Sequence, residues 1–354
     1  MPVPEAENIV EIPPIQSDDP RTRLLNSSDR IGFGASTTGG SNYVYVKTFS
    51  ELKAALEQDG NYVILDPSLA GQEIAFTDRI WGASNITLDG SLAPGHSFVA
   101  GPSMPSNFVM LAFGGSVSGN VIIHSIKFDG KYSKHGIEQG ALALQKGTNY
   151  WIDHCEITDF LDDSLTMGTS VASAADYITV SNNKIHNTGK ALYGFYQNTV
   201  HHGQGHVTAF FNELNGAERN PNNRGAEHFH LFNNWIHDWA HEGVVSGGFG
   251  VTRFKHLAGN RTKDSVMLSQ SNFYESAGTR NQCAETADPY VNYGGWIYAD
   301  GQSIYNGLSI CGTPNHVNEN SNEGPGRPHI PYSYNLLPAD QVKSYVLQNV
   351  GPID

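Results

Sequence analysis

Charged residues of both signs recur at one distance after a repeated sequence motif. Twelve residues beyond the start of each copy of the motif, the chain carries in turn Ser133, Asp162, Lys190, Arg219 and His241. Carboxylates are hard ligands that suit Ca²⁺, and lysine and arginine side chains pair with carboxylates. This column predicts a groove that holds an acidic polysaccharide, partly through a bridging metal ion.

Two more aspartates and a second arginine extend this candidate site. Asp153 ends the segment YWID, and the alternation of a strand points its side chain out of the core, toward the side that Asp162 and Asp163 are expected to occupy. The three aspartates predict a calcium site rather than a zinc site, because all their donor atoms are oxygens. Arg224 ends the segment RNPNNR that begins at Arg219.

Each of these residues also has a purely structural explanation. Asp162 and Asp163 could cap a turn, Lys190 could be a solvated loop residue, and Pro221 could fix a bend beside Arg219. Their coincidence in one column favours a site over these separate explanations.

The motif that sets the spacing is an eight-residue pattern with apolar first, third and eighth positions. Its copies begin 29, 28, 29 and 22 residues apart and read VIIHSIKF, YWIDHCEI, ITVSNNKI, VTAFFNEL and FHLFNNWI. The sixth positions run Ile126, Cys155, Asn183, Asn212 and Asn234, and stacked asparagine amides can satisfy one another inside a turn. Irregular spacing above twenty residues predicts a parallel β-helix, in which coils stack and length differences go into loops. A β-sandwich would need tight hairpin signals, which are sparse here.

The segments that flank the repeats predict caps at both ends. Residues 45–60 carry apolar residues at helical spacing with Ser50 as a candidate N-cap, and this helix would cover the open end of the coils. Residues 337–351 predict a second short helix that packs along the coils. We expect residues 1–30 to form an extended arm and residues 31–354 to form a single β-helix domain, monomeric because both ends are capped.

Composition limits the partners and the compartment. The net charge of −14 argues against a nucleic-acid partner, and no apolar segment is long enough to span a membrane. Cys283 and Cys311 could form a disulfide in an oxidising compartment, an alternative that the sequence leaves open. The N-terminal segment lacks the pattern of a signal peptide, but the low charged content and the abundant glycine and asparagine favour a secreted, extracellular protein.

Six segments in order resemble the family 1 polysaccharide lyases, the pectate and pectin lyases, over about residues 32–351. They are IGFGASTTGG, NVIIHSIKF, YWIDHCEIT, ITVSNNKIHNTGK, RNPNNR and PYSYNLLPADQVKSYVLQNVG. The resemblance implies a right-handed parallel β-helix that cleaves α-1,4-linked polygalacturonate, the backbone of pectin, by β-elimination. The products would be 4,5-unsaturated oligogalacturonides.

The resemblance also implies roles for individual residues. Arg219 would remove the C5 proton, Lys190 would bind the uronate carboxylate, and Arg224 would hold the substrate. Asp153 would be a calcium ligand together with Asp163. Met167 stands where the family's pectate lyases have a second carboxylate, for which Asp162 could substitute. His154 and His230 are expected to support the groove and the bound substrate through hydrogen bonds.

Other functions stay open at this point. If calcium is not held, the chain is a metal-independent pectin lyase acting on methyl-esterified pectin. A non-catalytic β-helix that binds acidic glycans and a glycoside hydrolase with two opposed carboxylates are further alternatives. A zinc hydrolase is disfavoured, because none of the histidine-rich segments has the H-E-x-x-H arrangement.

Overall fold

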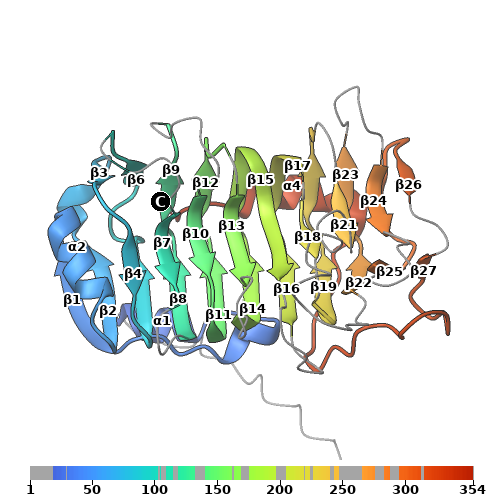
Figure 1. Ribbon diagram of the computed structural model, residues 1–354, viewed down its shortest axis with the longest axis horizontal. Helices are drawn as coiled ribbons and strands as arrows, with labels where there is room; N and C mark the ends of the chain where they lie inside the picture. The colour runs from blue at the N-terminus through green and yellow to red at the C-terminus, as the bar shows by residue number, and fades with distance from the viewer. Residues whose placement is uncertain are drawn as a thin grey trace, which may run out of the picture.

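The chain is a stack of right-handed coils whose strands run parallel to one another (Figure 1). The computed structural model describes residues 19–28, 30–102, 104, 109–114, 119–131, 140–161, 163–168, 175–196, 205–218, 220–223, 226–239, 243–246, 265–275, 283–287, 295–311 and 315–353. Every strand pair among these residues is parallel. Within these ranges, no helix has the length and apolar character needed to cross a membrane.

One sheet of eleven strands forms the first face of the coils. Neighbouring strands in this sheet come from successive coils. In spatial order they are β1 (Asn42–Val46), β2 (Asn61–Leu65), β5 (Ile86–Asp89), β8 (Gly119–His124), β11 (Gly147–Asp153), β14 (Ala175–Ser181), β16 (His206–Phe210), β19 (His228–Phe232), β22 (Ser265–Gln270), β25 (Gly295–Ala299) and β27 (His316–Asn318).

A second sheet of sixteen strands forms two rows that β15 (Lys184–Tyr196) joins, because this long strand bends from one row into the other. The row that follows the first face contains β3 (Glu73–Phe76), β6 (Ser97–Ala100), β9 (Lys127–Asp129), β12 (Glu156–Thr158), β17 (Glu213–Glu218), β20 (Trp235–His237) and β23 (Phe273–Glu275). The other row contains β4 (Ile80–Gly82), β7 (Val109–Phe113), β10 (Gly140–Leu144), β13 (Asp163–Gly168), β18 (Asn222–Asn223), β21 (Val244–Ser246), β24 (Cys283–Ala287) and β26 (Ser309–Cys311).

The five copies of the repeated motif stack in the register that the sequence predicts. Their first residues pair from strand to strand in the order Val121, Tyr150, Ile178, Val207 and Phe229. A sixth copy that the sequence analysis missed, MLSQSNFY, begins at Met267, which pairs with Phe229. Its serine and glutamine residues hide the apolar pattern.

The sixth positions form the predicted asparagine ladder. The side-chain oxygen of each asparagine accepts the backbone N–H of the residue one coil earlier, at 2.8–3.0 Å along the series Cys155, Asn183, Asn212, Asn234 and Asn272. The residue before each rung has a left-handed backbone, with φ between 47° and 55° at Ser125, His154, Asn182, Phe211, Asn233 and Ser271. The ladder therefore satisfies the polar groups of a tight turn that would otherwise be buried without partners.

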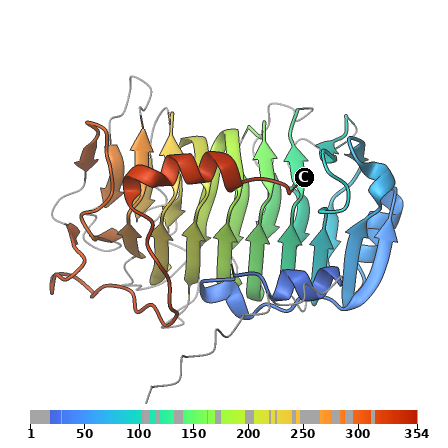
Figure 2. The same cartoon turned by 180° about the vertical axis from the view of Figure 1, so that it is seen from behind.

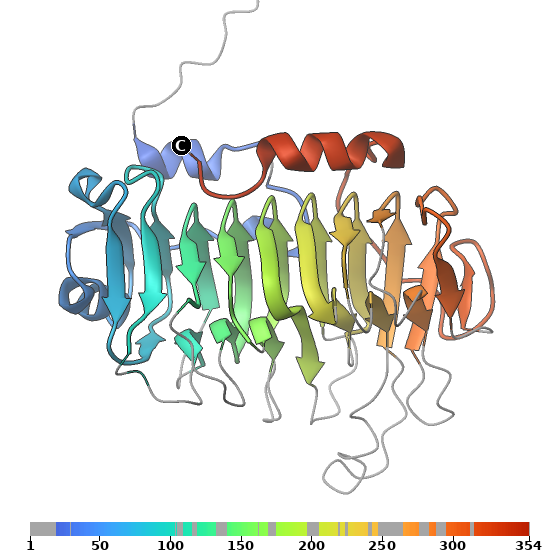
Figure 3. The same cartoon turned by 90° about the horizontal axis from the view of Figure 1, so that it is seen from above.

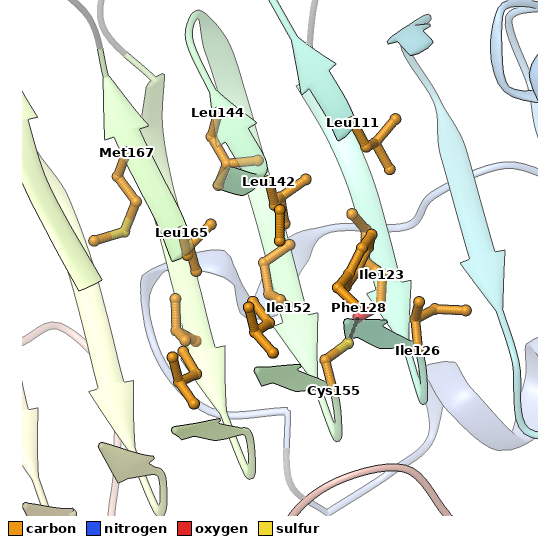
Figure 4. Packing of buried hydrophobic residues seen from close by; sticks show 14 of the residues in the cluster. Leu111, Ile123, Ile126, Phe128, Leu142, Leu144, Ile152, Cys155, Leu165 and Met167 are labelled. Atoms are coloured by element: carbon orange, nitrogen blue, oxygen red, sulfur yellow. Dashed lines mark hydrogen bonds between the residues drawn. The ribbon is translucent and has the colours of Figure 1, made fainter. Parts of the chain in front are cut away.

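Apolar side chains of successive coils stack in the interior of the coils. Leu111, Leu142 and Leu165 are in register on β7, β10 and β13 and belong to one buried cluster (Figure 4). Met167 lies in the same cluster, fully buried and in register with Leu144. The repeat thus stabilises the fold by burying one continuous apolar column.

A short helix covers the end of this column at the first coils. The helix α2 (Phe49–Leu56) buries Leu52 and Leu56 at the first coils (Figure 1). Its N-cap is Thr48, not Ser50 as the sequence suggested, because Glu51 and Thr48 form a reciprocal capping box.

Two further helices lie along one side of the coils (Figure 3). The helix α4 (Ala339–Asn349) confirms the second predicted helix and packs Val342 and Val346 on Trp235. The helix α1 (Pro20–Leu25) corrects the expectation of an extended arm over its described part, because Leu24 packs into a buried cluster with Trp151 on the first sheet. Residues 1–18 of the predicted arm lie outside the described residues.

Two smaller elements and a disulfide complete the described fold. The 3-10 helix η1 (Phe33–Ser36) crosses β11, β14 and β16, and η2 (Pro67–Leu69) follows β2. Cys283 and Cys311 form a disulfide between the last two coils, with their Cα atoms 5.7 Å apart. Cys155 is a free, buried cysteine, and burial raises the pKa of its thiol to about 12.

Candidate functional site

Residues of the predicted charged column lie on neighbouring coils where the second sheet turns from one row of strands into the other. Asp163 on β13 pairs with Lys190 on β15, and Lys190 pairs with Glu218 on β17. The aligned residues are therefore Asp163 and Glu218, not Asp162 and Arg219, so the predicted column is displaced by one residue on each side of Lys190. Neighbouring strands lie about 4.8 Å apart, so these three backbone positions span two rungs.

The displacement follows from the unequal lengths of successive coils. Thr158, His186 and Asn215 are in register before the bend. The number of residues between these positions and the charged column decreases by one in each successive coil, as the pairing of Asp163, Lys190 and Glu218 shows. A register shift between His186 and Thr188 absorbs part of the difference. A count of residues from the motif cannot reveal this, because the differences lie beyond the motif.

The segment RNPNNR directly follows this column and is fixed by its buried asparagines. The side chain of Asn220 accepts the N–H of Gly216 at 2.7 Å and donates to its carbonyl at 3.0 Å. The side chain of Asn223 accepts the N–H of Ala226 at 2.8 Å and donates to its carbonyl at 3.0 Å. Both side chains are fully buried, so the backbone on either side of Arg219 and Arg224 is held to the coils.

The side chains that the sequence places in the groove are only partly within the described structure. Asp162, Arg219 and Arg224 lie outside the described residues. Lys190 and Asp163 are described through their backbone and strand pairing. The structure therefore fixes the register of the candidate site, and the roles of these five residues stay predictions.

Met167 does not occupy a groove position. Its side chain points into the core beside Leu165 and Leu144 (Figure 4). Because the position faces inward, a carboxylate there would be buried without a partner. Residue 167 is thus a core position rather than a lost calcium ligand. Asp162 is therefore not needed as a substitute for a carboxylate at this position.

Asp153 and His154 lie elsewhere, which corrects their assignment to the calcium and substrate sites. Asp153 ends β11 on the first sheet, in register with His124 on one side and Ser181 on the other. The strand alternation does turn its side chain out of the core, as predicted. The face is a different one, because a coil has three strand faces and alternation distinguishes only inside from outside.

The surroundings of Asp153 form a polar cluster under the N-terminal helix and the C-terminal tail. One carboxylate oxygen accepts hydrogen bonds from Ser181 at 2.7 Å and Asn182 at 3.1 Å. The other lies 2.7 Å from His154 Nδ1 and 3.3 Å from His124 Nδ1. Burial opposes ionisation, but the hydrogen bonds with both histidines hold the pKa of Asp153 well below its ordinary value.

A cavity of about 440 Å³ opens beside this cluster. Its lining comes from α1, from the ends of β5, β8 and β11, from His154 and from Ile353 in the tail. Figure 2 shows α1 and the tail after α4 along this face of the coils. No residue of β13, β15 or β17 contributes to the lining among the described residues, so the cavity is separate from the charged column.

His230 also supports a different part of the molecule from the one predicted. It is fully buried on β19, where Nδ1 lies 2.8 Å from the hydroxyl of Tyr332 and Nε2 lies 2.9 Å from Oε1 of Gln270. The histidine therefore anchors the C-terminal tail on the first sheet instead of supporting the groove.

Two residues next to these sites were missed. Glu218 aligns with Lys190 only because of the unequal coil lengths, and nothing in the motif spacing signals this. His124 was within reach of the sequence, because it holds the fourth position of the first motif copy, as Asp153 does in the second.

Comparison with known proteins gives one family. Residues 22–353 match the family model described as pectate lyase. A pectin lyase from Bacillus subtilis is 30% identical over 219 residues, which cover 58% of this chain and 59% of the relative. A probable pectate lyase A from Aspergillus flavus is 27% identical over 240 residues, or 66% of this chain and 62% of the relative. The match thus spans about three fifths of the length of these two relatives.

Solved structures share the fold. The major allergen of cedar pollen, jun a 1, superposes with a TM-score of 0.60 at 18% identity and covers 95% of both chains. A pectate lyase from Bacillus sp. N165, solved in complex with trigalacturonate, gives a TM-score of 0.57 at 17% identity over 91% of this chain and 98% of that one.

Proposed function

This chain belongs to the pectate lyase family, and we propose that it cleaves α-1,4-linked polygalacturonate by β-elimination. The observation that carries the proposal is the register of Asp163, Lys190 and Glu218 on consecutive coils beside the fixed segment RNPNNR. A column of charged residues spaced by one rung suits a chain of repeating uronates that lies across the coils.

The reaction requires removal of a poorly acidic proton. The C5 hydrogen is α to a carboxylate, and taking it away adds negative charge to an anion. In the proposed mechanism Lys190 binds this carboxylate and stabilises the developing charge, while the neutral guanidine of Arg219 takes the proton. The electrons of the C5–H bond form the C4=C5 double bond, the bond from C4 to the glycosidic oxygen breaks, and that oxygen takes a proton from water.

Arginine can act as this base only if its pKa is lowered. The reference pKa of arginine lies above about 12, and nearby cations oppose a further positive charge. Lys190 and Arg224 supply such cations in the proposed site. Activity is therefore expected to rise toward alkaline pH, as more of the Arg219 population loses its proton.

Calcium belongs to this proposal with a different set of ligands from the one that the sequence suggested. The backbone register of Asp163 and Glu218 beside Lys190 supports a site in which these two residues and Asp162 would supply the hard oxygen donors that calcium prefers. Asp153 is not among them. A bound Ca²⁺ would neutralise part of the charge of the substrate carboxylate.

A metal-independent pectin lyase is the second candidate. The observation that favours it is the position of Asp153 at the end of β11, because this sequence-predicted calcium ligand lies outside the groove. A methyl-esterified uronate carries no charge and needs less help from cations. Either reading fits a secreted protein, and the disulfide between Cys283 and Cys311 supports an oxidising compartment.

The decisive assay follows the ultraviolet absorbance of the unsaturated product. Polygalacturonate, low-ester pectin and high-ester pectin are each tested with calcium and with a chelator. We expect the absorbance to rise with polygalacturonate in the presence of calcium. The rate of this rise should be lower in the presence of the chelator. A rise only with high-ester pectin, unaffected by chelation, would select the pectin lyase reading, and no rise with any substrate would leave a glycan-binding protein.

A further inference from the structure

The cluster of His124, Asp153 and His154 brings together three donor groups, two imidazoles and one carboxylate, outside the charged column. Each residue offers one donor atom, and the three atoms lie within 4.8 Å of one another. The two histidine Nδ1 atoms face the same carboxylate oxygen, at 2.7 and 3.3 Å. Two atoms bound to one tetrahedral metal ion lie about 3.3 Å apart, so the donors are close to the spacing that such an ion requires.

The scaffold holds these donors in place. Asp153 and His124 are neighbours in register on β11 and β8, and His154 occupies the left-handed turn position directly after Asp153, with φ 50°. Ser181 and Asn182 bind the carboxylate oxygen that faces away from the histidines. Such supporting hydrogen bonds orient the ligands of metal sites.

The chemistry of the donors selects the kind of ion. Two imidazole nitrogens and one carboxylate oxygen suit zinc and similar divalent transition metals, whereas calcium prefers oxygen donors alone. The side chains of His124 and His154 keep 10% and 15% of their surface exposed beside the cavity. Water can therefore reach the cluster and complete the coordination.

Other histidines in the chain show what a purely structural pair looks like. His186 bonds to Glu156 at 2.8 Å, and His206 bonds to Asp176 at 3.0 Å. Each of these carboxylates meets a single imidazole in the described structure. Among the described residues, only the cluster at Asp153 brings three candidate metal ligands to one point.

We propose that His124, Asp153 and His154 bind a zinc-class divalent metal ion, with water from the adjacent cavity as the remaining ligand. This site is separate from the charged column and does not depend on the proposed lyase activity. It also differs from the predicted calcium site in its ligands and in its face of the fold.

The test is calorimetric titration of the untagged, metal-free full chain with Zn²⁺. We expect wild type to bind zinc at this site, the affinity to fall at least tenfold in His154→Ala and Asp153→Asn, and His186→Ala to bind as wild type does. His154→Ala is the main variant because its side chain lies in a turn, and circular dichroism checks that each variant is folded.

Co²⁺ provides a second readout that does not depend on affinity. Cobalt added to the metal-free wild type should give visible absorption bands of nitrogen and oxygen coordination, and these bands should be absent in His154→Ala. Wild type that takes up no zinc would overturn the proposal. Zinc affinity and cobalt bands that are unchanged in His154→Ala would also overturn it, because they would place the ion at other histidines.

Discussion

At the scale of single residues, the first sheet buries several polar side chains and provides each of them with hydrogen-bond partners. His230 is the clearest case, because both ring nitrogens have partners and the ring is fully buried. Burial disfavours the charged imidazolium and lowers the pKa of His230 to about 3. An unfolded chain would protonate this histidine near pH 6.5.

This difference predicts a measurable dependence of stability on pH. Because the unfolded state binds the proton more readily, the contribution of neutral His230 is complete above about pH 6.5 and is lost as the pH falls toward 3. We expect the melting temperature of His230→Gln to fall less steeply than that of wild type between pH 7 and pH 4. The exposed variant His329→Gln serves as the control and should follow wild type. Parallel curves for His230→Gln and wild type would refute this explanation.

Residue type and alternation predicted orientation better than location. The sequence indicated that Asp153 leaves the core, and it does so. Alternation says nothing about which of three faces a strand belongs to, so the same reasoning put Asp153 beside Asp163. The expectation that residue 167 is a calcium-ligand position was wrong for a related reason, because a motif alignment does not distinguish inward from outward positions.

At the scale of elements, the asparagine ladder holds the turn that follows each strand of the first sheet. Asn212 shows its function best. Its side-chain oxygen accepts from both nitrogens of Asn183 at 3.0 Å, and its amide donates to the carbonyls of Val180 and Phe210 at 2.9 and 3.0 Å. All of these groups are buried, so they have no access to water as a substitute partner.

We therefore predict that Asn212→Ala lowers the free energy of unfolding by roughly 3 kcal/mol or more, because several buried groups lose their partners. Urea unfolding of the two proteins measures the difference. Asn215→Ala is the matched control, since Asn215 is partly exposed and its contact with His237 is a long one of 3.4 Å. A loss of stability no larger than that of the control would show that water replaces the ladder.

The ladder was predictable, whereas the lengths of the coils were not. Asparagine recurs at a fixed place in the motif, so its stacking follows from the repeat itself. The residues between the motif and the second row of strands vary in number, and the bend in β15 depends on packing with both neighbouring coils. That is why the predicted column was displaced by one residue while the motif register was confirmed.

At the scale of the whole molecule, the stacking of coils in register places residues that are far apart in sequence next to one another. Residues 163, 190 and 218 are far apart in sequence and consecutive in space. The helix α2 covers the first coils, α4 packs along the side of the stack on Trp235, and the disulfide between Cys283 and Cys311 joins the last two coils. The net charge of −14 would repel an anionic polysaccharide, so binding must depend on local cations or on a bridging metal ion.

In the proposed reaction, Lys190 and Arg219 act together at one column. The most direct measurement is the initial rate of unsaturated product formation from polygalacturonate by wild type, Lys190→Ala, Arg219→Lys and the control Lys184→Ala. Lys184 lies at the far end of the same strand. We expect Lys190→Ala and Arg219→Lys to lose activity roughly a thousandfold at unchanged melting temperature. The control Lys184→Ala should keep wild-type activity. Folded Lys190→Ala and Arg219→Lys proteins with near wild-type rates would contradict the proposed roles of these two residues.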